Sequence, residues 1–181
     1  MDAFSPARLN EWQRRMEAVA VPANSPIDLV SEFAEPWCLA AAEIVTGSSP
    51  ADRESLLSAA RIVSRAAAEP MDEELRQRAT VADAELEKYF RDATIPMPGP
   101  TFVALSRTTA CLLASGWLAL LQNPAELAHL RAHPDLIPKT IEEILRYSRV
   151  PESVGTSRTH EVGSFVRQRK AHEFWTLVGL G

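Results

Sequence analysis

The sequence predicts a mainly α-helical fold. Apolar residues recur at helical spacing through most of the chain, and prolines stand mainly where one helical pattern stops and the next begins. The alternation typical of strands is confined to one short stretch. The length of 181 residues suits one domain, and 46% hydrophobic with 24% charged residues is ordinary for a globular protein.

Serine, proline and glycine positions predict the helices of the first third of the chain. Serine and proline are favoured at the N-cap and in the first turn, where the N–H that proline lacks has no helical partner. Gly47 stands where the third of these helices should end, and glycine is common just past a helix C-terminus. The expected helices cover 5–19, 28–33, 36–46 and the stretch from 49 to before Pro70.

The rest of the chain alternates between helical patterns and breaks. The range 72–92 has apolar residues on one helical face and charged residues on the other. Three prolines within 95–100 indicate a stiff connection that excludes helix. After it we expect an apolar helix over 104–122, shorter helices over 124–133 and 137–150, extended chain over 151–163, and one more amphipathic helix in 164–181.

Charge and cysteine content exclude several classes of function. The net charge is −5 with both signs interspersed, which provides no basic surface for nucleic acid. Cys38 and Cys111 lie in apolar helical runs, which indicates two buried thiols in a reducing compartment rather than a disulfide. The four histidines have no second ligand at metal spacing, so no metal site is expected.

Neither the N-terminus nor the longest apolar run resembles a targeting or membrane segment. The N-terminus has no basic start followed by an apolar core, so it is not a signal peptide. The apolar run 111–121 is too short to span a bilayer. We therefore expect a cytoplasmic protein without membrane contact.

Four blocks of sequence carry a resemblance to a known family. The stretch LALLQNPAELAHLRAHPDLIPKTIEEILRY contains Glu143 and Arg146, which lie one helical turn apart and can form an ion pair. It resembles, nearly position by position, the segment that ends in the Glu-x-x-Arg helix of bacterial cytochromes P-450. AFSPARLNEWQRRME, PIDLVSEFAEPWCLAAAEIVTGSSPADRESL and SVGTSRTHEVG resemble further segments of that family in the right order, so that the resemblance covers most of 3–163.

The resemblance implies a reduced cytochrome P-450-like helical bundle with a short strand segment near the C-terminus. It would comprise a helical domain over 1–163 and a divergent tail over 164–181, which is a candidate docking helix. Glu143 and Arg146 match a pair that has a structural role in the family. Arg158 matches the arginine that contacts a haem propionate there.

Departures from the family argue against its oxygen chemistry. The family binds its haem iron through a cysteine in a glycine-rich loop beyond the Glu-x-x-Arg helix, and this sequence shows no such loop. The family pattern Ala-Gly-x-(Asp/Glu)-Thr-Thr is replaced by the run ALSRTT over 104–109. Leu105 would fill the oxygen groove, and Arg107 replaces a proton-relaying acid by a fixed cation. We therefore expect no cofactor and no monooxygenase activity.

Several functions remain open for such a scaffold. The first is a haem-free protein of secondary metabolism that binds a hydrophobic small molecule and steers a cofactor-independent cyclisation or rearrangement, with Arg107, Thr108 and Thr109 as the catalytic candidates. Arg107 could instead form an ion pair with a carboxylate of a neighbouring helix, such as Glu43 or Glu85, and threonines in a helix more often bond back to its preceding turn. The alternatives are a non-catalytic helper of a partner biosynthetic enzyme and a decayed remnant. An incomplete bundle leaves apolar surface exposed, and either the tail or a second copy of the chain in a homodimer would cover it.

Overall fold

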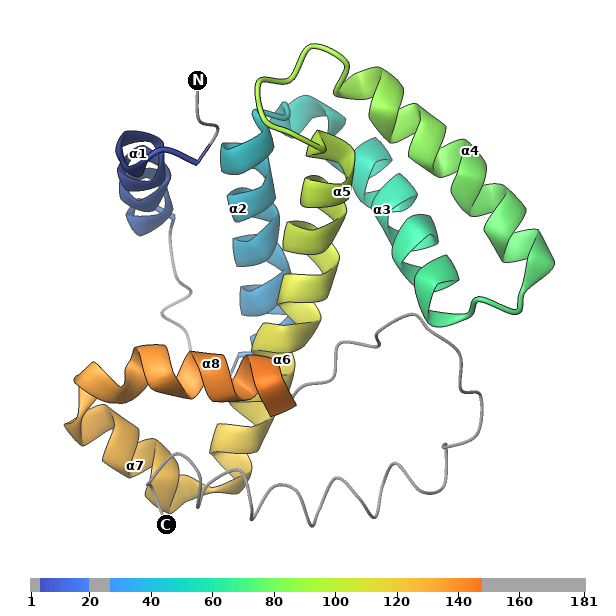
Figure 1. Cartoon of the computed structure of the whole chain (residues 1–181). Helices are drawn as coiled ribbons and strands as arrows, with labels where there is room; N and C mark the ends of the chain where they lie inside the picture. Colours follow the sequence, from blue (N-terminus) through green and yellow to red (C-terminus); the bar gives the residue numbers. More distant parts are fainter. Residues whose placement is uncertain (1–3, 20–26, 148–181) are drawn as a thin grey trace. The chain divides into compact units, whose positions relative to one another are not determined.

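The computed structural model describes residues 4–19 and 27–147, and these residues are mainly helical, with no strand among them (Figure 1). The predicted helical class is confirmed. The expected extended segment, 151–163, and the expected tail helix, 164–181, lie outside the described residues. The chain divides into two compact units, one up to Cys111 and one from Leu112, and each is described by itself.

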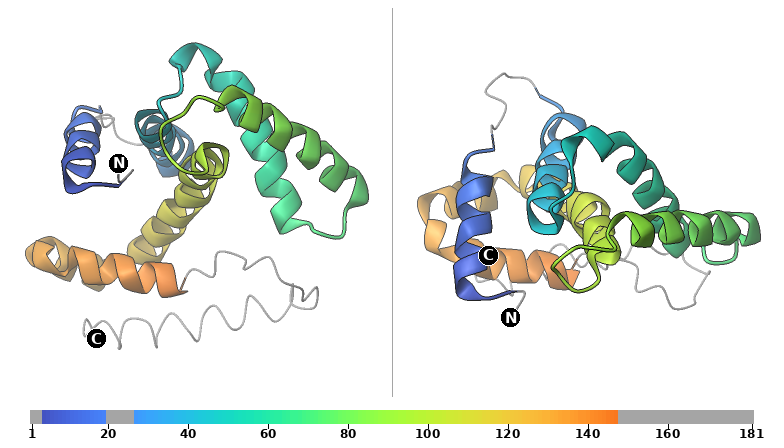
Figure 2. Two further views of the ribbon diagram at one scale, coloured as in Figure 1. Left: turned by 45° about the horizontal axis from the view of Figure 1, so that its top comes forward. Right: turned by 90° about the horizontal axis from the view of Figure 1, so that it is seen from above.

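The described part of the first unit is built mainly from helices. In it, α2 packs against α5, and α3 and α4 form a helical hairpin (Figure 1, Figure 2). Two segments, η1 and η3, are π-helical, and η2 is a turn of 3₁₀ helix. The elements are α1 (Pro6–Glu17), η1 (Leu29–Ala34), α2 (Glu35–Thr46), η2 (Pro50–Asp52), α3 (Arg53–Ala68), α4 (Glu73–Tyr89), α5 (Pro98–Val103) and η3 (Ala104–Thr108).

Most predicted helix ends agree with the structure, but two expectations were wrong. Gly47 ends α2 with a φ of 75°, a left-handed conformation that favours glycine. The helices expected over 28–33 and 36–46 are continuous, because η1 runs directly into α2. Helix also begins inside 95–100, at Pro98, since prolines are tolerated in a first turn whose N–H groups have no helical partner.

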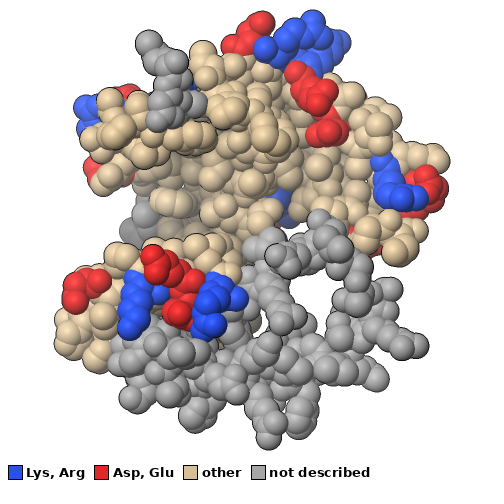
Figure 3. Space-filling model, in the orientation of Figure 1, with Lys and Arg blue, Asp and Glu red and all other residues tan. Residues whose placement is uncertain are grey.

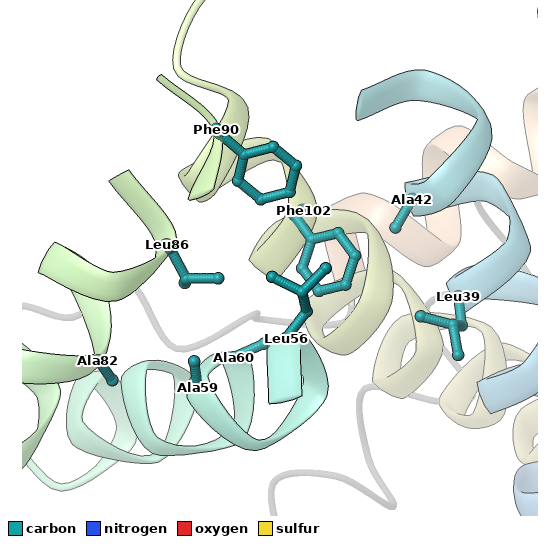
Figure 4. Close-up of a cluster of buried hydrophobic side chains, with 9 residues drawn as sticks. All are labelled: Leu39, Ala42, Leu56, Ala59, Ala60, Ala82, Leu86, Phe90 and Phe102. Atoms are coloured by element: carbon teal, nitrogen blue, oxygen red, sulfur yellow. The ribbon is translucent and has the colours of Figure 1, made fainter. Parts of the chain in front are cut away.

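A cluster of nine buried apolar side chains forms the core of the first unit (Figure 4). Phe102, with no exposed surface, lies at its centre, and its ring centroid is 5.8 Å from that of Phe90. Because four of the nine are alanines, the helices approach one another closely around these rings. The cluster consists of Leu39, Ala42, Leu56, Ala59, Ala60, Ala82, Leu86, Phe90 and Phe102.

Most of the predicted apolar face of α4 is buried, whereas Ala79 is half-buried and Tyr89, the last residue of the helix, is exposed. Leu75, Ala82 and Leu86 are buried. Tyr89 is 39% exposed, and its hydroxyl donates a hydrogen bond to Asp52 Oδ2 at 2.9 Å while accepting one from the Ser49 N–H at 3.0 Å. The ring therefore ties the end of α4 to the turn before α3.

The second unit contains the larger part of α6 (Thr109–Gln122), together with α7 (Pro124–Ala132), η4 (Pro134–Leu136) and α8 (Ile137–Tyr147). Leu120 is its one buried apolar residue in the described range, packed against half-buried leucines and Ile144. A methyl group placed at Gly116 would lie 3.0 Å from Ile144 Cδ1, so glycine permits the close contact of α6 with α8.

One face of α8 carries large apolar side chains that are exposed within the described part of the chain. Ile137, Ile141 and Leu145 follow one another at a spacing of four residues and are 44%, 51% and 51% exposed. Charged residues of both signs are interspersed on the visible face of the molecule (Figure 3). Uncovered apolar surface is what we expected of an incomplete bundle, and its partner stays a prediction.

The helical run Pro98–Gln122 meets the length and composition of a membrane span. This run extends beyond the apolar stretch 111–121, which by itself is too short to span a bilayer. Buried helices of soluble proteins meet the same criterion, so the run is weak evidence for a membrane. The cytoplasmic location stays a prediction.

Candidate functional site

The polar residues that interrupt the apolar helix lie in η3, where the backbone is π-helical. The hydroxyl of Ser106 is buried and donates a hydrogen bond to the Phe102 carbonyl oxygen at 2.6 Å. The Thr109 hydroxyl donates to the Ala104 carbonyl oxygen at 3.0 Å, and the Thr109 N–H donates to the same oxygen. Thr108 is half-buried, and its hydroxyl has no hydrogen-bond partner within 4–19 and 27–147.

Arg107 forms an ion pair with the first residue of α2. Its Nη1 lies 3.0 Å from Glu35 Oε1, and the two side chains are 21% and 40% exposed. The structure thus gives Arg107 an acidic partner on a neighbouring helix, but the partners that we expected from the sequence, Glu43 and Glu85, were wrong. Glu43 instead accepts two hydrogen bonds from Arg53, at 2.7 and 2.9 Å.

Arg107 also lines a cleft of ≈ 220 Å³ in the first unit. Six of the nine lining residues are polar, three of them arginines, and the other three are apolar. Small-molecule sites likewise combine apolar contact with convergent polar groups. Of the three predicted catalytic residues, only Arg107 reaches it, and Thr108 and Thr109 do not. The lining consists of Ser31, Glu35, Pro36, Leu39, Arg53, Leu57, Arg61, Ser106 and Arg107.

Sequence reasoning missed the contribution of α3 to this cleft. Arg53, Leu57 and Arg61 are spaced by four residues, so they share one face of the helix. That spacing could have been used to predict that one face of α3 combines two arginines with a leucine. Taken alone, however, arginines on an amphipathic helix most often belong to a solvated surface.

The remaining predicted site residues lie elsewhere. Arg146 Nη2 is 2.8 Å from Glu143 Oε2 in α8, which is the ion pair that their spacing predicts. These two residues do not line the cleft of the first unit. Arg158 lies outside the described residues.

Comparison with known proteins identifies the relatives of this chain. Pentalenic acid synthase of Streptomyces avermitilis is 33% identical over 109 residues, which are 59% of this chain and 25% of the synthase. Cytochrome P-450 107B1 of Saccharopolyspora erythraea is 28% identical over 86% of this chain and 45% of its own length. Putative cytochrome P-450 140 of Mycobacterium tuberculosis is 52% identical over 48 residues, covering 26% of this chain and 11% of that protein. The chain is related to the bacterial cytochromes P-450.

The relationship to cytochromes P-450 covers only part of those proteins. This chain spans less than half of the length of each of the three relatives. No family model and no solved structure matches it. The family relationship is therefore shown, whereas activity, substrate and partners are matters for proposal.

The described residues of this P-450 relative do not fit a thiolate-bound haem. A haem-binding cysteine of this kind must be a thiolate beside an open cavity. Cys38 is fully buried, and burial, together with the neighbouring Cys111, raises the pKa of its thiol to about 11. Leu105 packs against the core cluster, and Cys111 is exposed. Neither cysteine lines the cleft, and residues 4–19 and 27–147 contain no cluster of metal-binding side chains.

The two thiols should differ sharply in reactivity. At pH 8 we expect iodoacetamide to modify Cys111 readily and Cys38 only after unfolding, because Cys38 is buried and its raised pKa keeps it protonated. The expectation from sequence that both cysteines are buried was wrong for Cys111. Mass spectrometry of labelled peptides, with and without urea, measures both rates. Equal labelling of the two residues in the folded protein would contradict the burial of Cys38.

Proposed function

We propose that this chain is a haem-independent P-450-like protein that binds a hydrophobic small molecule in the Arg107 cleft. There it would steer a cyclisation or rearrangement without a cofactor. The observation that supports this most is the position of Arg107, a cation that stands where the family has an acid and lines a cleft that also contains apolar side chains. The P-450 relationship supports descent from a scaffold that handles small molecules.

The side chains of the cleft suit binding and orientation. The guanidinium of Arg107 is a fixed cation, so it can stabilise negative charge on a ligand oxygen but cannot serve as a general acid. Glu35 is the one carboxylate among the lining residues and can accept a proton from a bound ligand. Leu39 and Leu57 supply apolar contact that restricts the conformations of a bound chain. Shape and fixed charge, rather than redox chemistry, would then direct the reaction.

Binding by the purified full chain tests the proposal. Pentalenic acid is a rational first ligand, because one relative is named as its synthase. We expect calorimetry to detect binding to the wild type and at least about tenfold weaker binding to Arg107→Met, which removes the charge but keeps an apolar stem. Arg78→Met, an exposed arginine on α4 away from the cleft, is the matched control and should bind normally.

A spectroscopic test addresses haem separately. After reduction and addition of carbon monoxide, purified protein should show no absorbance band of a thiolate-ligated haem. Appearance of that band at one haem per chain would overturn haem independence. Absence of ligand binding, together with activation of a partner biosynthetic enzyme, would instead support the helper function.

A further inference from the structure

The cleft carries one positive charge that the described structure does not neutralise. Arg53 is paired with Glu43 through two hydrogen bonds, and Arg107 is paired with Glu35. Arg61 also lines the cleft, is exposed, and has no acidic or hydrogen-bonding partner among the described residues. One uncompensated cation therefore remains in this cleft, although the whole chain has a net charge of −5.

Two guanidinium groups in the cleft have donors to spare. A guanidinium has five N–H donors, and Arg107 uses one of its nitrogens for Glu35. Arg61 uses none within the described residues. Arg61 comes from α3 and Arg107 from η3, two elements that pack against each other. A small anion in the cleft can accept hydrogen bonds from both.

The other lining residues indicate what kind of molecule would carry such an anionic group. Pro36, Leu39 and Leu57 offer apolar contact beside the arginines. The volume of ≈ 220 Å³ equals that of about seven water molecules at ~30 Å³ each and lies below the range of drug-sized sites. The cleft thus suits a short apolar chain, or one end of a longer molecule, with a charged head.

We infer that the cleft binds a monocarboxylate with an aliphatic body, with its head held by Arg61 and Arg107. The guanidinium group is planar and pairs with carboxylate through parallel hydrogen bonds. A single uncompensated positive charge matches a carboxylate, whereas a phosphate ester would leave excess negative charge beside Glu35. This inference rests on the proposed function and names the class of ligand for the same site.

Hexanoate and hexan-1-ol separate the charged head from the apolar body. We expect wild-type protein to bind hexanoate about tenfold more tightly than hexan-1-ol, with shifts of the Arg61 and Arg107 Nε–Hε signals in nuclear magnetic resonance titrations. In Arg61→Gln this preference should disappear while hexan-1-ol binds as before. Arg61 forms no hydrogen bond or ion pair with the described residues, so the variant is expected to fold. Arg78→Gln is the matched control and should keep the preference.

The outcomes distinguish this inference from the proposed function. Equal binding of hexanoate and hexan-1-ol, or an unchanged preference in Arg61→Gln, would overturn the carboxylate assignment and leave a small-molecule cleft standing. If neither hexanoate, hexan-1-ol nor pentalenic acid binds, the proposed function fails as well. Tighter binding of hexyl phosphate than of hexanoate would assign the cleft to a phosphate ester instead.

Discussion

Replacement of Phe102 by alanine is expected to lower the free energy of unfolding of the first unit by about 4 kcal/mol. The side chain has no exposed surface and lies in the centre of the core cluster. Four of the other eight residues of the cluster are alanines on α2, α3 and α4, and their side chains are too short to fill the space that the ring would leave. A loss of this size is a large part of the roughly 5–15 kcal/mol that stabilises a typical domain.

Urea denaturation followed by circular dichroism measures this effect. Phe102→Leu keeps much of the volume and should cost about 1–2 kcal/mol. Val81→Ala changes a residue that is 61% exposed on α4, so it should stay within about 0.5 kcal/mol of wild type. If Phe102→Ala cost no more than Val81→Ala, the packing of α5 against α2 and α3 would have to be wrong.

The local part of the fold could be predicted from the sequence. Helix starts at Ser5-Pro6 and Ser49-Pro50, the C-cap at Gly47 and the buried face of α4 follow from capping and periodicity, which act within one or two turns. The prolines of 95–100 led to the wrong prediction that this stretch excludes helix. Proline breaks the interior of a helix but is accepted in its first turn. Phe102 was overlooked for the same reason, since the helix that holds it begins within that stretch.

The candidate site could be predicted only in part. Arg107 was identified because a cation in an apolar helix requires a partner, but the identity of that partner, Glu35, depends on a contact between residues 72 positions apart. Local spacing carries no signal for such a pair. Thr108 and Thr109 were grouped with Arg107 by their place in the sequence, whereas the helical rotation per residue directs neighbouring side chains to different faces. Arg107 lines the cleft and the two threonines do not.

Replacement of Glu35 by alanine should lower the free energy of unfolding by about 2 kcal/mol. The Arg107 side chain is only 21% exposed, so the loss of its carboxylate partner leaves a mostly buried charge with fewer hydrogen bonds. Removing one partner of a fully buried pair costs roughly 3–5 kcal/mol, and exposed pairs contribute about 0–1 kcal/mol. The exposure of this pair places it between those limits.

A double-mutant cycle with Arg107→Met isolates the interaction of the two side chains. Because methionine needs no counter-charge, Glu35→Ala should cost little once Arg107 is gone, giving a coupling of about 1–2 kcal/mol. The exposed Arg65–Glu69 pair on the same unit, with side chains 64% and 49% exposed, should show a coupling below about 0.5 kcal/mol. Equal coupling in the two cycles would mean that Glu35 does not hold Arg107. The guanidinium would then be free to turn wholly toward a ligand, and the charge balance that favours a monocarboxylate in the cleft would no longer apply.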